Sequence, residues 1–329
     1  MEKVIRWGII GCGGIAPKFI AGIRCLENTE VVAVASKSLD KAKSLADQEG
    51  IKLYFDNYET MVSHPEVDVV YVATSHNFHK ENMMLCLKHK KPVLCEKAFT
   101  VNAKEALEVI DFARKQGVFL MEAMWTRFLP CNVLLKKMLA EGVIGDVYHL
   151  QADFGSYAPF NADGRMYNIN LAGGALLDLG IYPVSFAYYI FGKEPVDITS
   201  LATIGPTGVD HQNAIIFAYN NGEMAIMSSS FMVQTTHLAV ITGTKGSITI
   251  PKFYMADRLI LKLNNQEPEE IVVPFDSTGY NYEAQEVINC LRAGKLESAV
   301  MLLNETLQIM NSLDAVRKNW KMRYPADLE

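Results

Sequence analysis

The chain has 329 residues, half of them hydrophobic, and a formal net charge of −6. This length predicts two domains of roughly 150 residues each, and the acidic balance argues against a nucleic-acid or anionic-membrane partner. Six scattered cysteines without a C-x-x-C pair predict reduced thiols, not disulfides or a metal site. With no secretory signal and no apolar run of bilayer length in the sequence, we expect a cytoplasmic protein.

The N-terminal segment predicts a dinucleotide-binding turn. Residues 4–10 form a buried strand by pattern, and a G-x-G-x-x-A spacing follows it directly. In such a turn the first glycine permits the tight bend, the second lets a pyrophosphate approach the backbone, and the alanine lets the next helix pack closely. The alternative is a turn without a ligand. We expect the cofactor to contact Gly11, Cys12, Gly13, Gly14, Ile15 and Ala16.

Strands and helices alternate through the first half of the chain. The predicted helices include one that ends near Gly50 and one that runs from Asn102 to Gly117. This alternation predicts an α/β domain with a doubly wound parallel sheet. Its further strands are expected at residues 30–35, 53–55, 67–74, 92–95 and 118–121.

The end of the second strand bears on cofactor choice. An acidic residue there would bind the ribose hydroxyls of NAD, but this chain has Ser36 and Lys37, and no acid before Asp40. A hydroxyl and an ammonium suit a 2′-phosphate, so NADP is favoured over NAD. The alternative is that Lys37 is an ordinary solvated turn lysine.

Polar residues also follow the fourth and fifth strands, at the sheet edge where open α/β sheets bind ligands. We expect Thr74 and Asn77 to contact the cofactor, and His79 either to do so or to cap the next helix. Glu96 and Lys97 form a charged pair whose burial is costly unless it is used or paired. The alternative is a structural contact between them with both charges in water. No metal is expected, because nothing nearby completes a ligand set with the histidines.

The second half changes to a period of two, which predicts an α+β domain with a large, mainly antiparallel open sheet. Asn220-Asn221-Gly222 marks a hairpin, and residues 284–293 and 299–318 predict closing helices, the second capped by Ser298. A bare sheet face predicts a homodimer. We place the domains at residues 1–123 and 124–329. The strands are expected at residues 148–154, 196–204, 214–219, 223–230, 237–242, 247–250, 259–263 and 271–273.

Asp178 and Tyr182 stand four residues apart, on one face if residues 176–189 are helical. A carboxylate and a phenol near the ammonium of Lys97 form an acid–base set, since a nearby positive charge lowers the pKa of a phenol. The alternatives are a capping role for Asp178 and a half-buried aromatic role for Tyr182.

Four motifs together resemble the Gfo/Idh/MocA family over the whole chain. They are GCGGIA at 11–16, CEKA at 95–98, EAMWTRF at 122–128 and GGALLDLGIY at 173–182. The third motif is similar to the dimeric dihydrodiol dehydrogenase branch, which includes NADP-linked D-xylose dehydrogenases. The resemblance implies a Rossmann domain followed by an α+β domain. It also implies hydride exchange between NAD(P) and a carbinol or carbonyl of a sugar, polyol or trans-dihydrodiol, in a dimer or a dimer of dimers.

The resemblance also implies residue roles. Lys97 holds the substrate oxygen, Asp178 orients the substrate, and Tyr182 stands where many members carry a catalytic histidine. Ala98 replaces the usual proline, as in the dihydrodiol branch. The remaining roles fall to side chains beside the nicotinamide and its phosphates, Trp125 and Arg127, and beside the substrate, Arg165 and Asn168.

Two other kinds of protein fit the same fold. One is a dinucleotide or sugar sensor without turnover. The other is an enzyme that keeps its NAD bound and oxidises and re-reduces one substrate. The substrate itself and the physiological direction are left open by the sequence.

Overall fold

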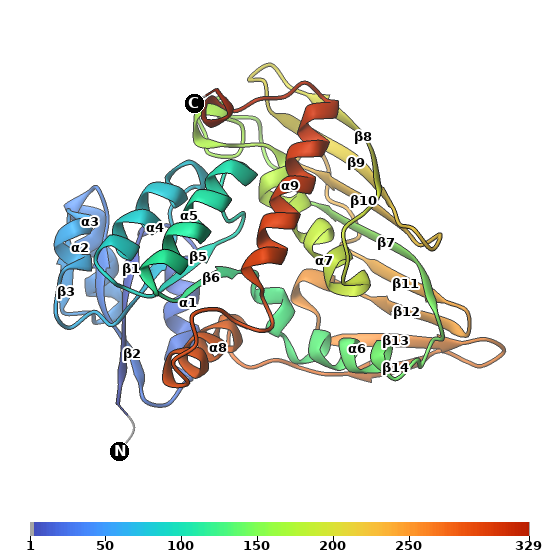
Figure 1. The fold of residues 1–329 in the computed structure, drawn as a ribbon, viewed down its shortest axis with the longest axis horizontal. Helices are drawn as coiled ribbons and strands as arrows, with labels where there is room; N and C mark the ends of the chain where they lie inside the picture. Colours follow the sequence, from blue (N-terminus) through green and yellow to red (C-terminus); the bar gives the residue numbers. More distant parts are fainter. Residues whose placement is uncertain (1–2, 329) are drawn as a thin grey trace. The chain divides into compact units, whose positions relative to one another are not determined.

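The computed structural model describes residues 3–328. The chain divides into two compact units, Met1–Trp125 with Asp276–Leu307, and Thr126–Phe275 with Gln308–Glu329. The predicted boundary between residues 123 and 124 assigns the segment Asp276–Leu307 to the second domain. The structure places this segment with the first unit. Figure 1 traces both units along the chain.

The first unit holds a six-stranded parallel sheet in the order β3-β2-β1-β4-β5-β6, so the predicted doubly wound sheet is confirmed. Its order reverses between β1 and β4, and the crevice for a ligand lies outside the carboxyl ends of the strands at such a reversal. The strands are β1 Ile5–Ile10, β2 Thr29–Ala35, β3 Leu53–Phe55, β4 Val69–Val72, β5 Val93–Glu96 and β6 Leu120–Ala123.

The helices of this unit pack in pairs, α4 on α5 and α1 on α8. The close approach of α1 to α8 needs Gly22, where a Cβ would lie 2.9 Å from the backbone nitrogen of Asn281. This contact joins a segment from the second half of the sequence to the first sheet. The helices are α1 Ala16–Ile23, α2 Leu39–Glu49, α3 Tyr58–Val62, α4 His79–Lys88, α5 Ala103–Gln116 and α8 Tyr280–Arg292.

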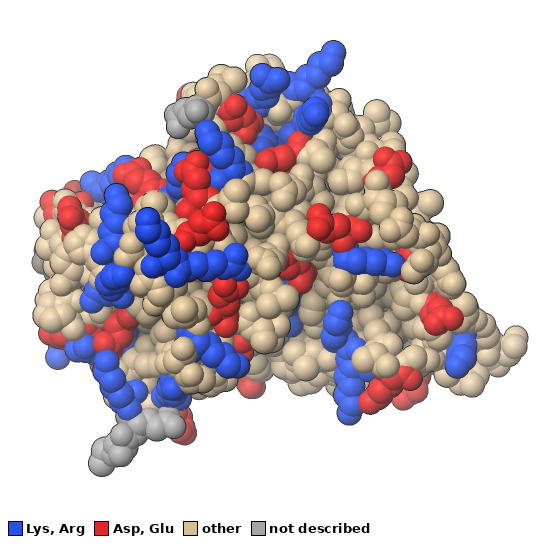
Figure 2. Space-filling view, in the orientation of Figure 1, with Lys and Arg blue, Asp and Glu red and all other residues tan. Residues whose placement is uncertain are grey.

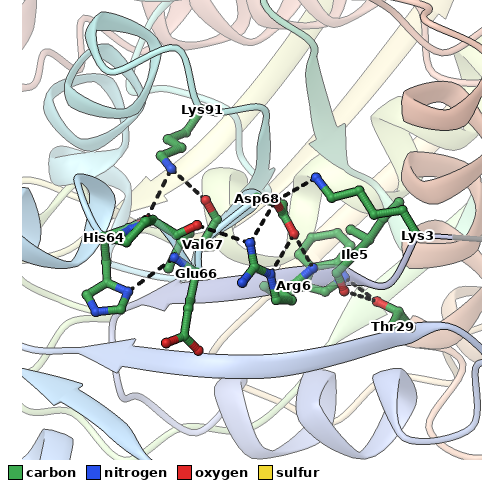
Figure 3. Close-up of polar contacts among 11 residues, drawn as sticks. Lys3, Ile5, Arg6, Thr29, His64, Glu66, Val67, Asp68 and Lys91 are labelled. Atoms are coloured by element: carbon green, nitrogen blue, oxygen red, sulfur yellow. Dashed lines mark hydrogen bonds and ion pairs between the residues drawn. The ribbon is translucent and has the colours of Figure 1, made fainter.

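The amino ends of the strands are tied by ion pairs, as Figure 3 shows. Asp68 accepts bonds from the backbone and guanidinium of Arg6 and from Lys3. Burial alone would raise the pKa of Asp68, but these bonds bring it below its usual value. Lys91 donates to the backbone oxygens of His64 and Val67 at 3.3 and 2.5 Å. The charged side chains at this edge thus bond to one another and to the backbone, and stabilise the sheet.

The second unit holds an eight-stranded sheet in the order β14-β13-β12-β11-β7-β10-β9-β8. Only the central pair of β7 and β10 is parallel, which confirms the expected, mainly antiparallel sheet. The predicted hairpin joins β9 to β10. The strands are β7 Val147–Gly155, β8 Asp197–Ile204, β9 Asp210–Ala218, β10 Met224–Ser230, β11 Ala239–Gly243, β12 Gly246–Ile250, β13 Arg258–Leu263 and β14 Glu269–Val272.

One face of this sheet is covered by α7 (Ile181–Phe191) and α6 (Pro130–Ala140). The helical stretch Ile169–Phe191 is the one segment within residues 3–328 long and apolar enough to cross a membrane, but 83% of its apolar window is buried in the protein. It serves here as a core element. On the face shown in Figure 2, lysine and arginine side chains are interspersed with acidic ones.

The opposite face of the sheet carries apolar side chains in register. Thr199, Ile216 and Ile226 are paired neighbours across β8, β9 and β10. Ile216 and Ile226 are each 37% exposed, and Leu201 is 77% exposed.

Two helices differ from their predicted form. The predicted helix 176–189 begins as a π-turn, Leu176–Gly180, in which the Ile181 N–H donates to the Leu176 oxygen. The last helix, α9, spans Leu303–Asn319 rather than 299–318. Ser298 accepts bonds from the backbone of residues 300 and 301, so it caps the turn before α9.

Candidate active site

The turn after β1 has the shape that a pyrophosphate needs. Gly11 has a φ of +102°, and a Cβ there would lie 2.6 Å from the Ala73 oxygen. At Gly13 and Gly14 a Cβ would meet nothing within 4 Å, so open space lies over the backbone. No side chain caps the start of α1, which leaves its N–H groups and the positive end of its dipole for an anion. These residues fit a dinucleotide.

The thiol of Cys12 belongs to this turn but carries no chemistry of its own. Its Sγ lies 3.6 Å from the Ala35 oxygen, and burial raises its pKa to about 11. It therefore stays a neutral thiol at physiological pH. Ile15 and Ala16 complete the turn, and the Ala16 N–H donates to the Gly13 oxygen.

The residues after β2 form a compact turn. The Ser36 hydroxyl accepts from the Ser38 N–H, and Ser38 in turn caps α2 through the Lys41 N–H. The Lys37 ammonium lies 4.4 Å from the ring centre of Phe78. Lys37 is exposed and lies over a residue that follows β4, at the carboxyl edge of the sheet.

Beyond β4, His79 and Asn77 have different surroundings. His79 is fully buried, with Nδ1 at 2.9 Å from the Ala98 oxygen and Nε2 at 3.0 Å from the Thr74 oxygen. Burial lowers its pKa, and the ring lies between the segments that follow β4 and β5, with each nitrogen facing a carbonyl oxygen. The Asn77 Oδ1 is buried without a hydrogen-bond partner. A bound cofactor amide or hydroxyl would satisfy such an oxygen.

Glu96 and Lys97 follow β5, and their environments differ from a solvated pair. Glu96 is buried and accepts bonds from the Tyr71 hydroxyl and, at 3.2 Å, from the Lys97 N–H. Burial, followed by the charge of Glu96, raises the pKa of Tyr71 well above its usual value, so Tyr71 remains a donor. Through the bond from the Lys97 N–H, Glu96 anchors the backbone of Lys97. The peptide bond between Lys97 and Ala98 is cis.

Trp125 and Arg127 occupy different surroundings. Trp125 is buried in the first unit and stacks on Tyr280 of α8, with ring centres 4.7 Å apart. Arg127 is buried in the second unit, where its guanidinium donates to the Ser185 hydroxyl at 3.0 Å and oxygen at 3.2 Å. The contacts observed for Arg127 thus hold α7.

The acid and phenol predicted from the sequence lie on the π-turn and the first turn of α7. Both Asp178 and Tyr182 are largely buried. The two terminal nitrogens of Arg165 donate to the two oxygens of Asp178, each at 3.1 Å. Such a bidentate pair fixes the plane of the carboxylate. Arg165 and Asp178 are thus brought together as expected for one site.

An aromatic wall lies beside Tyr182. Its ring centre is 5.2 Å from that of Phe154 and 6.1 Å from that of Tyr254, and Phe154 stacks on Tyr254 at 4.2 Å. Asn168, by contrast, caps the short helix Ile169–Leu171 by accepting the N–H of Asn170. Gly173 of the sequence motif shapes this region, because a Cβ at this position would lie 2.7 Å from the Arg165 oxygen.

Sequence reasoning missed Tyr71, Phe154 and Tyr254. A phenol inside a strand that is buried on both faces needs a hydrogen-bond partner. The sequence could therefore have predicted a polar partner for Tyr71. Tyr254 lies in a short turn far along the chain from Tyr182, and no local pattern connects the two.

Each unit of the chain matches a domain of one known family. The family described as "Oxidoreductase family, NAD-binding Rossmann fold" matches residues 5–124, and the Gfo/Idh/MocA C-terminal domain matches residues 133–249. The chain belongs to the Gfo/Idh/MocA oxidoreductase family. The family resemblance expected from the sequence is thereby confirmed, and with it an oxidoreductase built on an NAD(P)-binding domain.

Individual relatives and solved structures align with nearly the whole chain. The trans-1,2-dihydrobenzene-1,2-diol dehydrogenase of Mus musculus is 38% identical, over 98% of this chain and 99% of the mouse protein. The 3-ketoreductase of Actinomadura kijaniata, solved with NADP and TDP-benzene, is 25% identical with a TM-score of 0.84, over 95% of this chain and 97% of its own. The aldose–aldose oxidoreductase of Caulobacter crescentus has the same fold, with a TM-score of 0.89 at 23% identity, over 97% and 98% of the two chains.

Proposed function

We propose that this Gfo/Idh/MocA protein is an NADP-preferring dehydrogenase or reductase that acts on a CH–OH group of a trans-dihydrodiol, sugar or polyol. Lys97 and Tyr182 are its proton-handling pair. The curated relatives named as dihydrodiol dehydrogenases support the substrate class.

The first unit supplies the cofactor side of this proposal. The open turn at Gly13 and Gly14 and the uncapped start of α1 suit the pyrophosphate, and the buried Asn77 oxygen suits a polar group of the cofactor. The bound nicotinamide accepts or donates the hydride. Ser36 and Lys37, with no acid beside them, favour a 2′-phosphate and so NADP.

The second unit supplies the acid–base side. In oxidation Tyr182, as the phenolate, takes the proton of the substrate hydroxyl while the carbon gives up its hydride, and the Lys97 ammonium stabilises the negative charge that develops on the substrate oxygen. In reduction the same groups return the proton. Asp178 accepts a second substrate hydroxyl, and Arg165 holds its carboxylate in one plane.

One observation carries the proposal within the second unit. The bidentate Arg165–Asp178 pair stands one turn before a largely buried Tyr182 flanked by Phe154 and Tyr254. A fixed carboxylate and a phenol beside aromatic faces match a hydroxylated ring, which offers both hydroxyls and an apolar face.

The test is reduction of NADP and of NAD by the purified protein, with trans-1,2-dihydrobenzene-1,2-diol, D-xylose, D-glucose and myo-inositol in turn. Lys97→Met is expected to abolish most turnover while NADP binding, measured by calorimetry, stays nearly intact. Lys88→Met, at the exposed C-terminal turn of α4, is the matched control. Binding without turnover on any substrate would favour a sensor. Cofactor that co-purifies and never exchanges would favour a closed redox cycle.

We also propose a homodimer formed through the bare face of the eight-stranded sheet. Leu201, Ile216 and Ile226 are exposed on that face, and a second copy would remove their apolar surface from water. Sedimentation of the purified protein tests for this dimer. The same measurement shows whether two such dimers associate further.

A further inference from the structure

The second unit buries a carboxylate that the proposed reaction does not use. Asp210 opens β9 and is fully inaccessible to solvent. Its Oδ2 accepts the Leu176 N–H at 2.9 Å and the side-chain amide of Asn213 at 2.8 Å. A buried carboxylate is costly unless its bonds serve a purpose, and here the first bond caps the start of the π-turn.

The backbone before this turn is shaped around the same carboxylate. Gly174 has a φ of +116°, and a Cβ there would lie 2.4 Å from Oδ1 of Asp210. Any larger residue would displace either the turn or the carboxylate. The carboxylate of Asp210 therefore requires a glycine at position 174, although the two residues lie 36 positions apart in the sequence.

Further buried side chains hold the neighbouring residues of the turn. The Ser229 hydroxyl donates to the Ala175 oxygen at 3.3 Å and accepts from Asn213 at 2.7 Å. The Tyr324 hydroxyl donates to the Gly173 oxygen at 2.5 Å. Side chains of β9, β10 and the C-terminal segment thus hold three backbone groups of one short turn.

This turn places both members of the Arg165–Asp178 pair. Asp178 follows two residues after Leu176, on the π-turn that Asp210 caps. On its other side the turn touches the backbone of Arg165, since a Cβ at Gly173 would lie 2.7 Å from the Arg165 oxygen. A shift of the turn would move the carboxylate and its partner together.

We propose that Asp210 is a positioning residue, whose carboxylate fixes the turn from Gly173 to Leu176 and thereby the place of Asp178 in the substrate site. The inference rests on the proposed function for the role of Asp178. It adds that substrate affinity depends on a buried acid that never touches the substrate.

The charge state of Asp210 gives the proposal a pH signature. Burial raises its pKa to about 6, against the opposing effect of the Asn213 and Leu176 bonds and of Arg317. Arg317 is itself paired with Asp314 and Asp327, and burial keeps the nearby Tyr324 neutral by raising its pKa well above the usual value. Protonation below about pH 6 converts the charge-assisted bond to Leu176 into a weaker neutral one.

The experiment compares Asp210→Ala with Asp210→Asn. The alanine removes the oxygen that accepts both the Leu176 N–H and the Asn213 amide, whereas the asparagine keeps an uncharged oxygen for both bonds. We expect Asp210→Ala to raise KM above pH 7 by roughly 10-fold or more, as loss of a bond to a charged group implies, with a smaller change in kcat. Asp210→Asn is expected to recover part of the affinity. In the wild type KM should rise below about pH 6, and this rise should be absent in Asp210→Asn.

Tyr188→Phe is the matched control for stability. Tyr188 lies later in α7, away from the turn. The change removes the bonds of its hydroxyl to the Gln308 oxygen and the Ser312 hydroxyl of α9. It should lower Tm without changing KM. If Asp210→Ala behaves in the same way, with an unchanged KM and pH profile, Asp210 is merely structural and the proposal is wrong.

Amide hydrogen exchange at residues 173–182 gives a readout that does not require the proposed reaction. Faster exchange at Leu176 in Asp210→Ala, partly reversed in Asp210→Asn, supports the anchor even if the wild type turns over none of the substrates tested. Exchange at the wild-type rate overturns it. Absence of wild-type turnover, by contrast, counts against the proposed function and not against the anchor.

Discussion

Asp210 also makes a quantitative prediction for stability against pH. Its pKa lies at about 6 in the folded protein, against 3.8 for an ordinary aspartate. The folded state therefore binds this proton more tightly than the unfolded chain does. The stabilisation from protonation is fully present below about pH 4 and is lost as the pH rises through about 6. A difference of roughly 2 pKa units corresponds to about 3 kcal/mol in the free energy of unfolding.

Asp210→Asn removes this titration at nearly constant volume. We expect the free energy of unfolding of the variant, minus that of the wild type, to increase by about 3 kcal/mol from about pH 4 to about pH 7. Denaturant unfolding of both proteins across that range measures the difference, and other titrating groups cancel. The fixed cost of the altered Asn213 contact adds a constant offset and leaves the slope untouched. Parallel curves for the two proteins would refute the reasoning.

Four further outcomes are expected. Lys97→Met should lower kcat by several orders of magnitude with little change in NADP affinity by calorimetry. A surviving kcat would remove Lys97 from the mechanism. Tyr182→Phe should lower kcat by roughly 10²–10⁴-fold, the usual size of a lost proton transfer, and a near-normal rate would point to water or Asp178 as the base. Lys37→Ala should raise the Kd for NADP and leave that for NAD unchanged, and equal effects on both would contradict a 2′-phosphate contact. Ile226→Glu should give monomers by sedimentation, because a buried unpaired charge opposes the interface; a persisting dimer would place the interface elsewhere.

The sequence was enough to predict the first sheet. Period and spacing carry that information locally, since each buried strand is followed directly by its turn glycine or polar residue. The order of its six strands follows the doubly wound pattern. The assignment of Asp276–Leu307 to the first unit could not be predicted, because it depends on the contact between Gly22 of α1 and Asn281 of α8.

The second unit was harder to predict in detail. Alternating residues located its strands, but nothing local shows that β7 pairs with β10 in parallel. The π-turn at Leu176–Gly180 was missed for a similar reason. The backbone that leads into it is bonded by Asp210, Ser229 and Tyr324, which lie in distant parts of the chain. Arg165 was predicted beside the substrate, and its bidentate bond to Asp178 appears only in three dimensions.

The central claim is that this protein oxidises a CH–OH group with NADP through Lys97 and Tyr182. The most direct measurement is the rate of NADP reduction with trans-1,2-dihydrobenzene-1,2-diol and the three sugars or polyols, for the wild type and for Lys97→Met. We predict steady-state turnover by the wild type with at least one of these substrates, faster with NADP than with NAD, and almost none by the variant. Equal turnover in both proteins, or none in a wild type that binds NADP tightly, would contradict the claim.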